Sequence, residues 1–215
     1  MSTTKRFLDL VGLELPIVLA PMAGPGTAEL AIAVSQAGGL GSLPCAMSSA
    51  EQVRKDLGVI RQRTARPVNV NFFCHTPPPA QPEREDAWKA RMSGYYAELG
   101  VDASGAAAGP QRRPFDDAMC EIVEAVRPRV VSFHFGLPEP RLLARVKTAG
   151  ALVFSSATTA EEARWLEAGG CDVVIAQGNE AGGHRGMFLT DNIATQAGTL
   201  ALVPQVVDAV RVPVI

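Results

Sequence analysis

The glycine-rich segment at residues 176–186 carries the residue types best suited to chemistry. Its sequence is Ala-Gln-Gly-Asn-Glu-Ala-Gly-Gly-His-Arg-Gly, and it directly follows the apolar run at 172–175. Its glycines let backbone N–H groups approach a ligand closely, because no Cβ stands in the way. Gln177, Glu180 and His184 add an amide, a carboxylate and an imidazole, and imidazoles titrate near neutral pH. These groups indicate a ligand-binding loop with His184 as a candidate acid or base, with a solvated glycine-rich turn as the alternative.

Short apolar runs alternate with amphipathic stretches along nearly the whole chain. Most of the runs are apolar at successive positions, which is typical of parallel strands buried on both faces. Seven strands are expected, at 17–20, 40–43, 68–73, 130–135, 152–155, 172–176 and 212–215. Six helices are expected between them, at 28–36, 49–62, 115–126, 139–148, 159–168 and 200–210. Strands that alternate with helices predict a parallel sheet, either doubly wound and open or closed into a (β/α)8 TIM barrel.

Candidate functional groups follow six of the expected strands, and this distribution favours the barrel. An open sheet places its ligand at one switch point, whereas a barrel builds its active site from the loops after many strands. The groups, in chain order, are Pro21 to Ala23, Pro44 with Cys45, Asn71 to His75, His134, Ser155 with Ser156, and the glycine-rich segment. We therefore predict a TIM barrel whose site lies at the carboxyl ends of its strands.

Two segments depart from a regular barrel. Residues 76–114 are too long for a simple connection and contain Trp88, Tyr95, Tyr96 and a small-residue run at 103–109. We interpret them as an insertion after the third strand with one or two helices, either a lid-like cap or a surface excursion. The chain also stops in its seventh strand, whereas a closed barrel needs roughly one more strand and two more helices. The prediction is a single barrel domain over 1–215 that is incomplete at its C-terminal end.

The composition limits the possible partners. The chain has 215 residues, 47% of them hydrophobic and 20% charged, with a net charge of −2. This charge provides no basic stripe for a nucleic acid. The four cysteines are widely spaced and form no CxxC pair, which argues against a disulfide framework or a metal site and favours a reducing cytoplasm. Neither a signal peptide nor a membrane span is expected, and the oligomeric state stays open.

Five segments together resemble landmarks of the nitronate monooxygenase family, whose members are also known as nitropropane dioxygenases. They lie at 16–23, 37–41, 70–73, 131–136 and 176–186. The resemblance runs from about residue 7 to the last residue and is weakest over 76–114. It implies an FMN-dependent (β/α)8 barrel that oxidises alkyl nitronates or nitroalkanes with O2 to a carbonyl compound and nitrite.

The resemblance also implies roles for single residues. His184 matches a histidine that acts as a base or as the cationic partner of the nitronate. The implied flavin contacts are Pro21, Met22, Ala23, Asn71, Gln177, Gly182 and Gly183. The flavin contact implied for Asn71 also has a physical reason. The amide side chain of a buried strand needs hydrogen-bond partners, which a flavin or a neighbouring loop would supply. The residues that hold the flavin phosphate are expected beyond Ile215.

The chain departs from the family pattern at the fifth strand, where some members have a histidine and this chain has Ser155 and Ser156. His134 is either a spatial replacement or a rim histidine with structural partners. Glu180 is a candidate to orient His184 or raise its pKa, and Arg185 to attract an anion, although either could simply be solvated.

Two other functions stay open. One is an NAD(P)H-dependent flavin enoyl-acyl-carrier-protein reductase, which shares the Gly-Gly-His loop. The other is a non-catalytic barrel fragment that binds no flavin.

Overall fold

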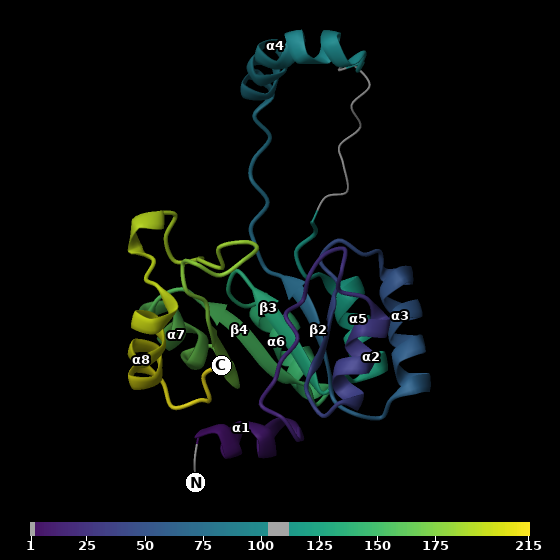
Figure 1. Ribbon diagram of the computed structural model, residues 1–215, viewed down its shortest axis with the longest axis vertical. Coiled ribbons are helices and arrows are strands. Elements are labelled where there is room, and N and C mark those ends of the chain that lie inside the picture. Colours follow the sequence, from purple (N-terminus) through teal and green to yellow (C-terminus); the bar gives the residue numbers. More distant parts are fainter. Residues whose placement is uncertain (1–2, 103–111) are drawn as a thin grey trace. The chain divides into compact units, whose positions relative to one another are not determined.

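The computed structural model describes residues 3–102 and 112–215, which divide into two compact units (Figure 1). The larger unit spans 1–75 and 113–215, and the smaller one spans 76–112. In the larger unit, five parallel strands form one sheet in the order in which they occur along the chain. They are β1 (Gly41–Pro44), β2 (Val68–Phe73), β3 (Val130–His134), β4 (Leu152–Ala157) and β5 (Val173–Ala176). The parallel α/β architecture expected from the sequence is therefore confirmed, as a partial barrel.

The two outermost predicted strands are single bridges instead of strands. Val18 pairs with Leu40 at one edge of the sheet, and Val214 pairs with Val174 at the other. Each segment has a ladder partner on one side only, and Ile17 at the first edge stays 56% exposed. The prediction of seven regular strands was therefore wrong at 17–20 and 212–215, although both segments do lie beside the sheet.

Six helices follow the predicted ranges to within two residues at each end. They are α2 (Ala28–Gln36), α3 (Ala50–Arg63), α5 (Asp117–Val126), α6 (Pro140–Thr148), α7 (Ala160–Ala168) and α8 (Thr199–Ala209). Several begin where the sequence supplies an N-cap: the side chains of Thr27, Ser49, Asp116 and Thr159 each accept a hydrogen bond from the N–H group three residues on. Such a bond satisfies an N–H group that has no partner within the helix, which fixes where the helix starts.

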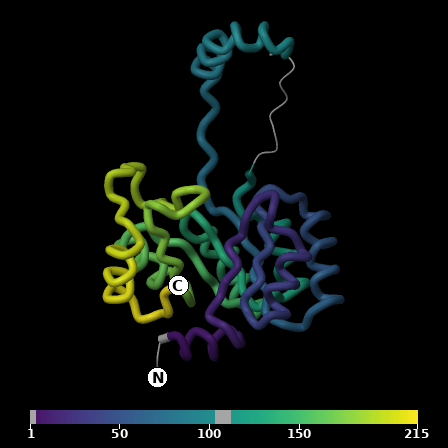
Figure 2. Tube along the Cα trace, viewed as in Figure 1, coloured from purple at the N-terminus to yellow at the C-terminus, as the bar shows by residue number. Residues whose placement is uncertain are grey.

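The two faces of the sheet bury different sets of side chains. The face that carries Val70, Val131 and Val153 packs against α2, α3, α5 and α6. The opposite face carries Leu40, Val130 and Phe154, and these pack against helix α1 (Thr3–Val11), which was not expected from the sequence. In Figure 2 α1 is the purple helix at the lower end of the larger unit. The interior of the partial barrel is therefore packed with apolar side chains at its amino end.

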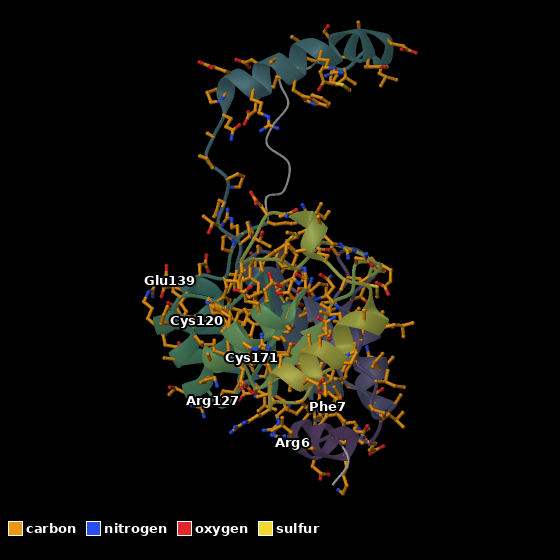
Figure 3. All side chains as sticks on the ribbon, turned by 90° about the vertical axis from the view of Figure 1, so that its left-hand side faces the viewer. Arg6, Phe7, Cys120, Arg127, Glu139 and Cys171 are labelled. Atoms are coloured by element: carbon orange, nitrogen blue, oxygen red, sulfur yellow. The ribbon has the colours of Figure 1, made fainter. Side chains whose placement is uncertain are left out.

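Helix α1 is also joined to the last part of the chain. The Arg6 guanidinium donates a hydrogen bond of 2.8 Å to the Arg211 carbonyl oxygen. Figure 3 labels Arg6 together with Phe7, whose ring lies 6.2 Å from that of Phe154. These contacts hold α1 in place, so the carboxyl ends of the strands are left as the open end for a site.

The smaller unit contains helix α4 (Pro82–Leu99), within the predicted insertion. Pro82 occupies the first helical position and Gly100 ends the helix in the left-handed conformation, both of which are common terminal signals. No α4 residue is buried, and Trp88, Tyr95 and Leu99 are exposed. The small-residue run at 103–109 lies outside the described residues, and the lid-like role of the insertion stays a prediction.

Across 3–102 and 112–215, no helix has the length and apolar character needed to cross a membrane.

Candidate functional site

Asn71 lies in the second half of β2 and is held by hydrogen bonds to the neighbouring strand β3. Asn71 is 7% exposed, and its Nδ2 atom donates to the Oγ atom of Ser132 at 2.9 Å and to the Ser132 carbonyl oxygen at 3.3 Å. The two residues are direct partners in the parallel register of the strands. These bonds use the NH2 group of Asn71 and leave its Oδ1 atom as an acceptor that a ligand can use.

Gln177 closes the glycine-rich loop upon itself. Its Nε2 atom donates to the His184 carbonyl oxygen at 2.8 Å, and its Oε1 atom accepts from the Gly186 N–H at 2.6 Å. The sequence suggested Gln177 as a flavin contact, whereas both polar atoms of its amide hold the loop in this structure. Gln177 therefore fixes the backbone on which His184 stands.

His134 holds the same carbonyl oxygen from the other side. Its Nε2 atom lies 3.1 Å from the His184 carbonyl oxygen, and its Nδ1 atom lies 3.0 Å from Ser156 Oγ. Because a carbonyl oxygen can only accept, we assign the ring proton to Nε2 and the Ser156 hydroxyl as donor to Nδ1. Burial lowers the pKa of His134, which favours this neutral form. Two roles were expected for His134, and the hydrogen bonds agree with the second, a rim histidine with structural partners.

Both charged neighbours of His184 in the loop are bound to backbone groups. Arg185 donates to the carbonyl oxygens of Gly178 and Ala181. The Glu180 carboxylate accepts from the N–H of Thr199, the first residue of α8, and its backbone hydrogen bonds lower the pKa of Glu180. Glu180 thus stabilises the N-terminus of α8, where a negative charge is favourable.

The three histidines of the chain gather around two phenylalanines. The His184 ring centroid lies 5.4 Å from that of Phe73 and 6.0 Å from that of Phe135. The His134 and His75 rings contact the same two phenylalanines, at 4.5–6.2 Å. This grouping was not expected from the sequence. The spacing of Asn71 and Phe73 was the available signal, since side chains two residues apart on a strand share a face.

Phe135 has an unusual backbone at the centre of this cluster. Its φ is +68°, in the left-handed region that side chains with a Cβ rarely adopt. Strained residues of this kind concentrate at functional sites, where the surrounding structure holds them. Cys74 lies beside Phe73 in the sequence. Burial strongly raises the pKa of its thiol, so Cys74 stays neutral and is not a nucleophile for this site.

Two glycines of the loop show why the segment suits a ligand. Gly183 has a φ of +78°, so its own backbone requires glycine. Gly182 has an ordinary φ, is exposed, and a Cβ built there would meet nothing within 4 Å. The fold therefore does not need glycine at 182, whereas a ligand that approaches the backbone closely would. An exposed glycine backbone and the free acceptor of Asn71 are the kinds of group that bind the polar edge of a flavin ring.

The first predicted loop is exposed. Met22 is 37% exposed, Pro21 and Ala23 are exposed as well, and the Met22 carbonyl oxygen accepts a hydrogen bond from the Gly26 N–H in the turn that follows. This exposure does not fit a methionine of the apolar core. The flavin contacts expected of these three residues stay predictions.

Comparison with known proteins identifies the family. The family model described as nitronate monooxygenase matches residues 4–215. A nitronate monooxygenase of Paraburkholderia phytofirmans is 40% identical over 216 residues, which cover 100% of this chain and 59% of that protein. The chain thus spans about three fifths of the length of this relative.

Solved structures agree with the family model. The nitroalkane oxidase from Streptomyces ansochromogenes superposes with a TM-score of 0.83 at 37% identity, covering 97% of this chain and 59% of that one. FabK from Thermotoga maritima superposes with a TM-score of 0.69 at 28% identity, covering 97% of this chain and 52% of that one. With the family model matched over nearly its whole length, the chain belongs to the nitronate monooxygenase family.

Proposed function

We propose that this chain binds FMN and supplies the acid–base residue for the oxidation of alkyl nitronates by O2 to a carbonyl compound and nitrite. The observation that carries the proposal is the arrangement of His184. Two side chains hold its backbone carbonyl oxygen, at 2.8 and 3.1 Å, while its imidazole is exposed beside Phe73 and Phe135. A fixed backbone with an accessible imidazole is what a residue that exchanges protons with a substrate requires.

The chemistry of the substrate suits an imidazole. A nitroalkane carries an acidic proton on the carbon next to the nitro group, and an imidazole is basic enough near neutral pH to remove it. The resulting imidazolium can hold the nitronate anion by charge and hydrogen bonding. The rings of Phe73 and Phe135 lie 5.4 and 6.0 Å from the imidazole and give it an apolar neighbour on the protein side. A bound flavin supplies the redox step, in which the nitronate loses electrons that finally reach O2.

The residues proposed to hold the flavin are those implied by the family resemblance. Asn71 offers its Oδ1 atom, Gly182 and Gly183 offer accessible backbone N–H groups, and Pro21 to Ala23 offer a surface with a methionine. Gln177 keeps the loop in its shape in addition to any direct contact. The N-terminus of α8 is already occupied by the Glu180 carboxylate, which would repel a phosphate, so we do not place the flavin phosphate there.

The test is turnover by the purified protein supplied with FMN. We expect a yellow protein that consumes O2 and releases nitrite when an alkyl nitronate is added. A protein that takes up FMN but releases no nitrite would contradict the proposed reaction. A protein that stays colourless after incubation with FMN would instead support a barrel without flavin.

The second candidate is an NAD(P)H-dependent flavin reductase of the enoyl-acyl-carrier-protein type, favoured by the Gly-Gly-His loop. Anaerobic mixing with NADH separates the two candidates. Rapid bleaching of the flavin absorbance by NADH would favour the reductase. Slow bleaching by NADH with rapid bleaching by a nitronate would favour the proposed function.

A further inference from the structure

We infer that Glu162 is a positioning residue for the loop that carries His184, because its buried carboxylate joins the turn after β4 to the segment that follows that loop. The inference rests on the proposed function of His184. It concerns a residue that lies on α7, outside the glycine-rich segment, and that acts through the backbone of Phe188 and Leu189.

The Glu162 carboxylate is shared between two loops. Glu162 is 1% exposed. Its Oε2 atom accepts from the N–H and the hydroxyl of Thr158, at 2.7 and 2.8 Å. Its Oε1 atom accepts from the N–H groups of Phe188 and Leu189, at 2.7 and 3.3 Å. One carboxylate therefore fastens the β4–α7 turn to residues 188–189.

Helix capping alone does not account for this arrangement. Thr159 is the N-cap of α7 and Glu162 stands three residues later, which is the capping-box pattern. In that pattern the glutamate bonds back to the start of its own helix and needs no burial. Here one oxygen does this at Thr158, and the other reaches a different loop. Burying a carboxylate is costly unless hydrogen bonds offset the lost hydration, so the four donors indicate a bridge that the fold maintains.

Two routes connect this bridge to the proposed site. Along the chain, Phe188 is only four residues beyond His184. Through space, the Phe188 ring covers Gly136, where an added Cβ would lie 3.2 Å from the ring, and it contacts Trp165 at 5.1 Å between centroids. Gly136 follows Phe135, whose ring flanks both His134 and His184. Holding the backbone of Phe188 therefore restrains both the end of the loop and the turn at Gly136 that follows Phe135.

Hydrogen exchange tests the bridge without reference to catalysis. Glu162→Gln keeps the size of the side chain but turns an acceptor into an NH2 group that faces N–H donors. The matched control is Glu161→Gln, which removes the same charge from an exposed neighbour in the same helical turn. We expect amides of residues 186–190 to exchange about tenfold faster in E162Q than in the wild type, and unchanged in E161Q. If E162Q does not fold, Glu162→Asp keeps the charge with a shorter reach, and it should accelerate the same amides.

A double-mutant cycle tests whether Glu162 acts through His184. The rate of anaerobic flavin reduction by a nitroalkane is measured for the wild type, E162Q, H184N and the double variant. E162Q should slow the reaction about tenfold when His184 is present and less than about twofold in the H184N background. Equal slowing in both backgrounds, or unchanged exchange at 186–190, would overturn the inference. Absence of nitronate oxidation in the wild type would instead overturn the proposed function, so the two failures are distinguishable.

Discussion

Substituting Gly182 and Gly183 separately distinguishes what the fold needs from what a bound flavin needs. In the structure a Cβ at residue 182 meets nothing within 4 Å, and its φ is ordinary. The neighbouring Gly183 has a φ of +78°, where any residue with a Cβ is strained. The two variants Gly182→Ala and Gly183→Ala therefore add the same methyl group to adjacent positions with opposite expected consequences.

The expected magnitudes follow from these two conformations. Gly182→Ala should leave the free energy of unfolding unchanged or raise it by up to about 1 kcal/mol, because alanine restricts the unfolded chain. Gly183→Ala should lower the free energy of unfolding by about 1–2 kcal/mol, which is the cost of the left-handed conformation. If the flavin lies against the backbone at 182, the added methyl group should weaken FMN binding by about 1–3 kcal/mol. That range corresponds to a Kd raised roughly 5- to 150-fold.

Two assays on each variant decide the outcome. Urea unfolding followed by circular dichroism gives the free energy of unfolding, and quenching of flavin fluorescence gives the Kd for FMN. A Gly182→Ala protein with wild-type stability and wild-type FMN affinity would refute the flavin contact at 182. A Gly182→Ala protein as unstable as Gly183→Ala would refute the structural reasoning about the loop.

Two further predictions concern the hydrogen bonds that hold the His184 carbonyl oxygen. Gln177→Met removes two loop hydrogen bonds, each worth about 0.5–1.5 kcal/mol. Hydrogen exchange at the Gly186 amide should therefore become roughly 5- to 150-fold faster. Unchanged exchange would show that Gln177 does not close the loop. Burial lowers the pKa of His134, so as the pH falls the unfolded chain protonates this imidazole before the folded protein does. The stability that neutral His134 contributes is therefore complete above about pH 6.5 and is lost as the pH falls through the lower pKa of the folded state. His134→Gln should therefore flatten the loss of stability between about pH 7 and 5 in urea unfolding, and an unchanged pH dependence would contradict the assigned neutral form.

The sequence predicted the elements whose signals are local. Ser49 and Thr159 mark helix starts by residue type, and both are N-caps in the structure. The edge segments at 17–20 and 212–215 could not be told from regular strands, because a strand depends on partners that are distant in sequence. Helix α1 was missed although Phe7 and Val11 stand at helical spacing, four residues apart, and both are buried.

The candidate site was predictable in its residue types and not in its bonds. The need of Asn71 for polar partners was expected, but its partner Ser132 is a property of the register between two strands. Likewise His134 meets Ser156 and the His184 carbonyl only because three segments converge in space. Glu162 was hidden for the opposite reason, since a glutamate after an N-cap has an ordinary local explanation.

The acid–base role of His184 is tested most directly by anaerobic flavin reduction in the wild type and in His184→Asn. A neutral nitroalkane must lose its proton before it can be oxidised, whereas a preformed nitronate has already lost it. We expect H184N to keep its yellow colour and to slow reduction by the nitroalkane at least about 100-fold, with a smaller effect for the preformed nitronate. Flavin reduction by the nitroalkane at the wild-type rate in H184N would contradict the role assigned to His184.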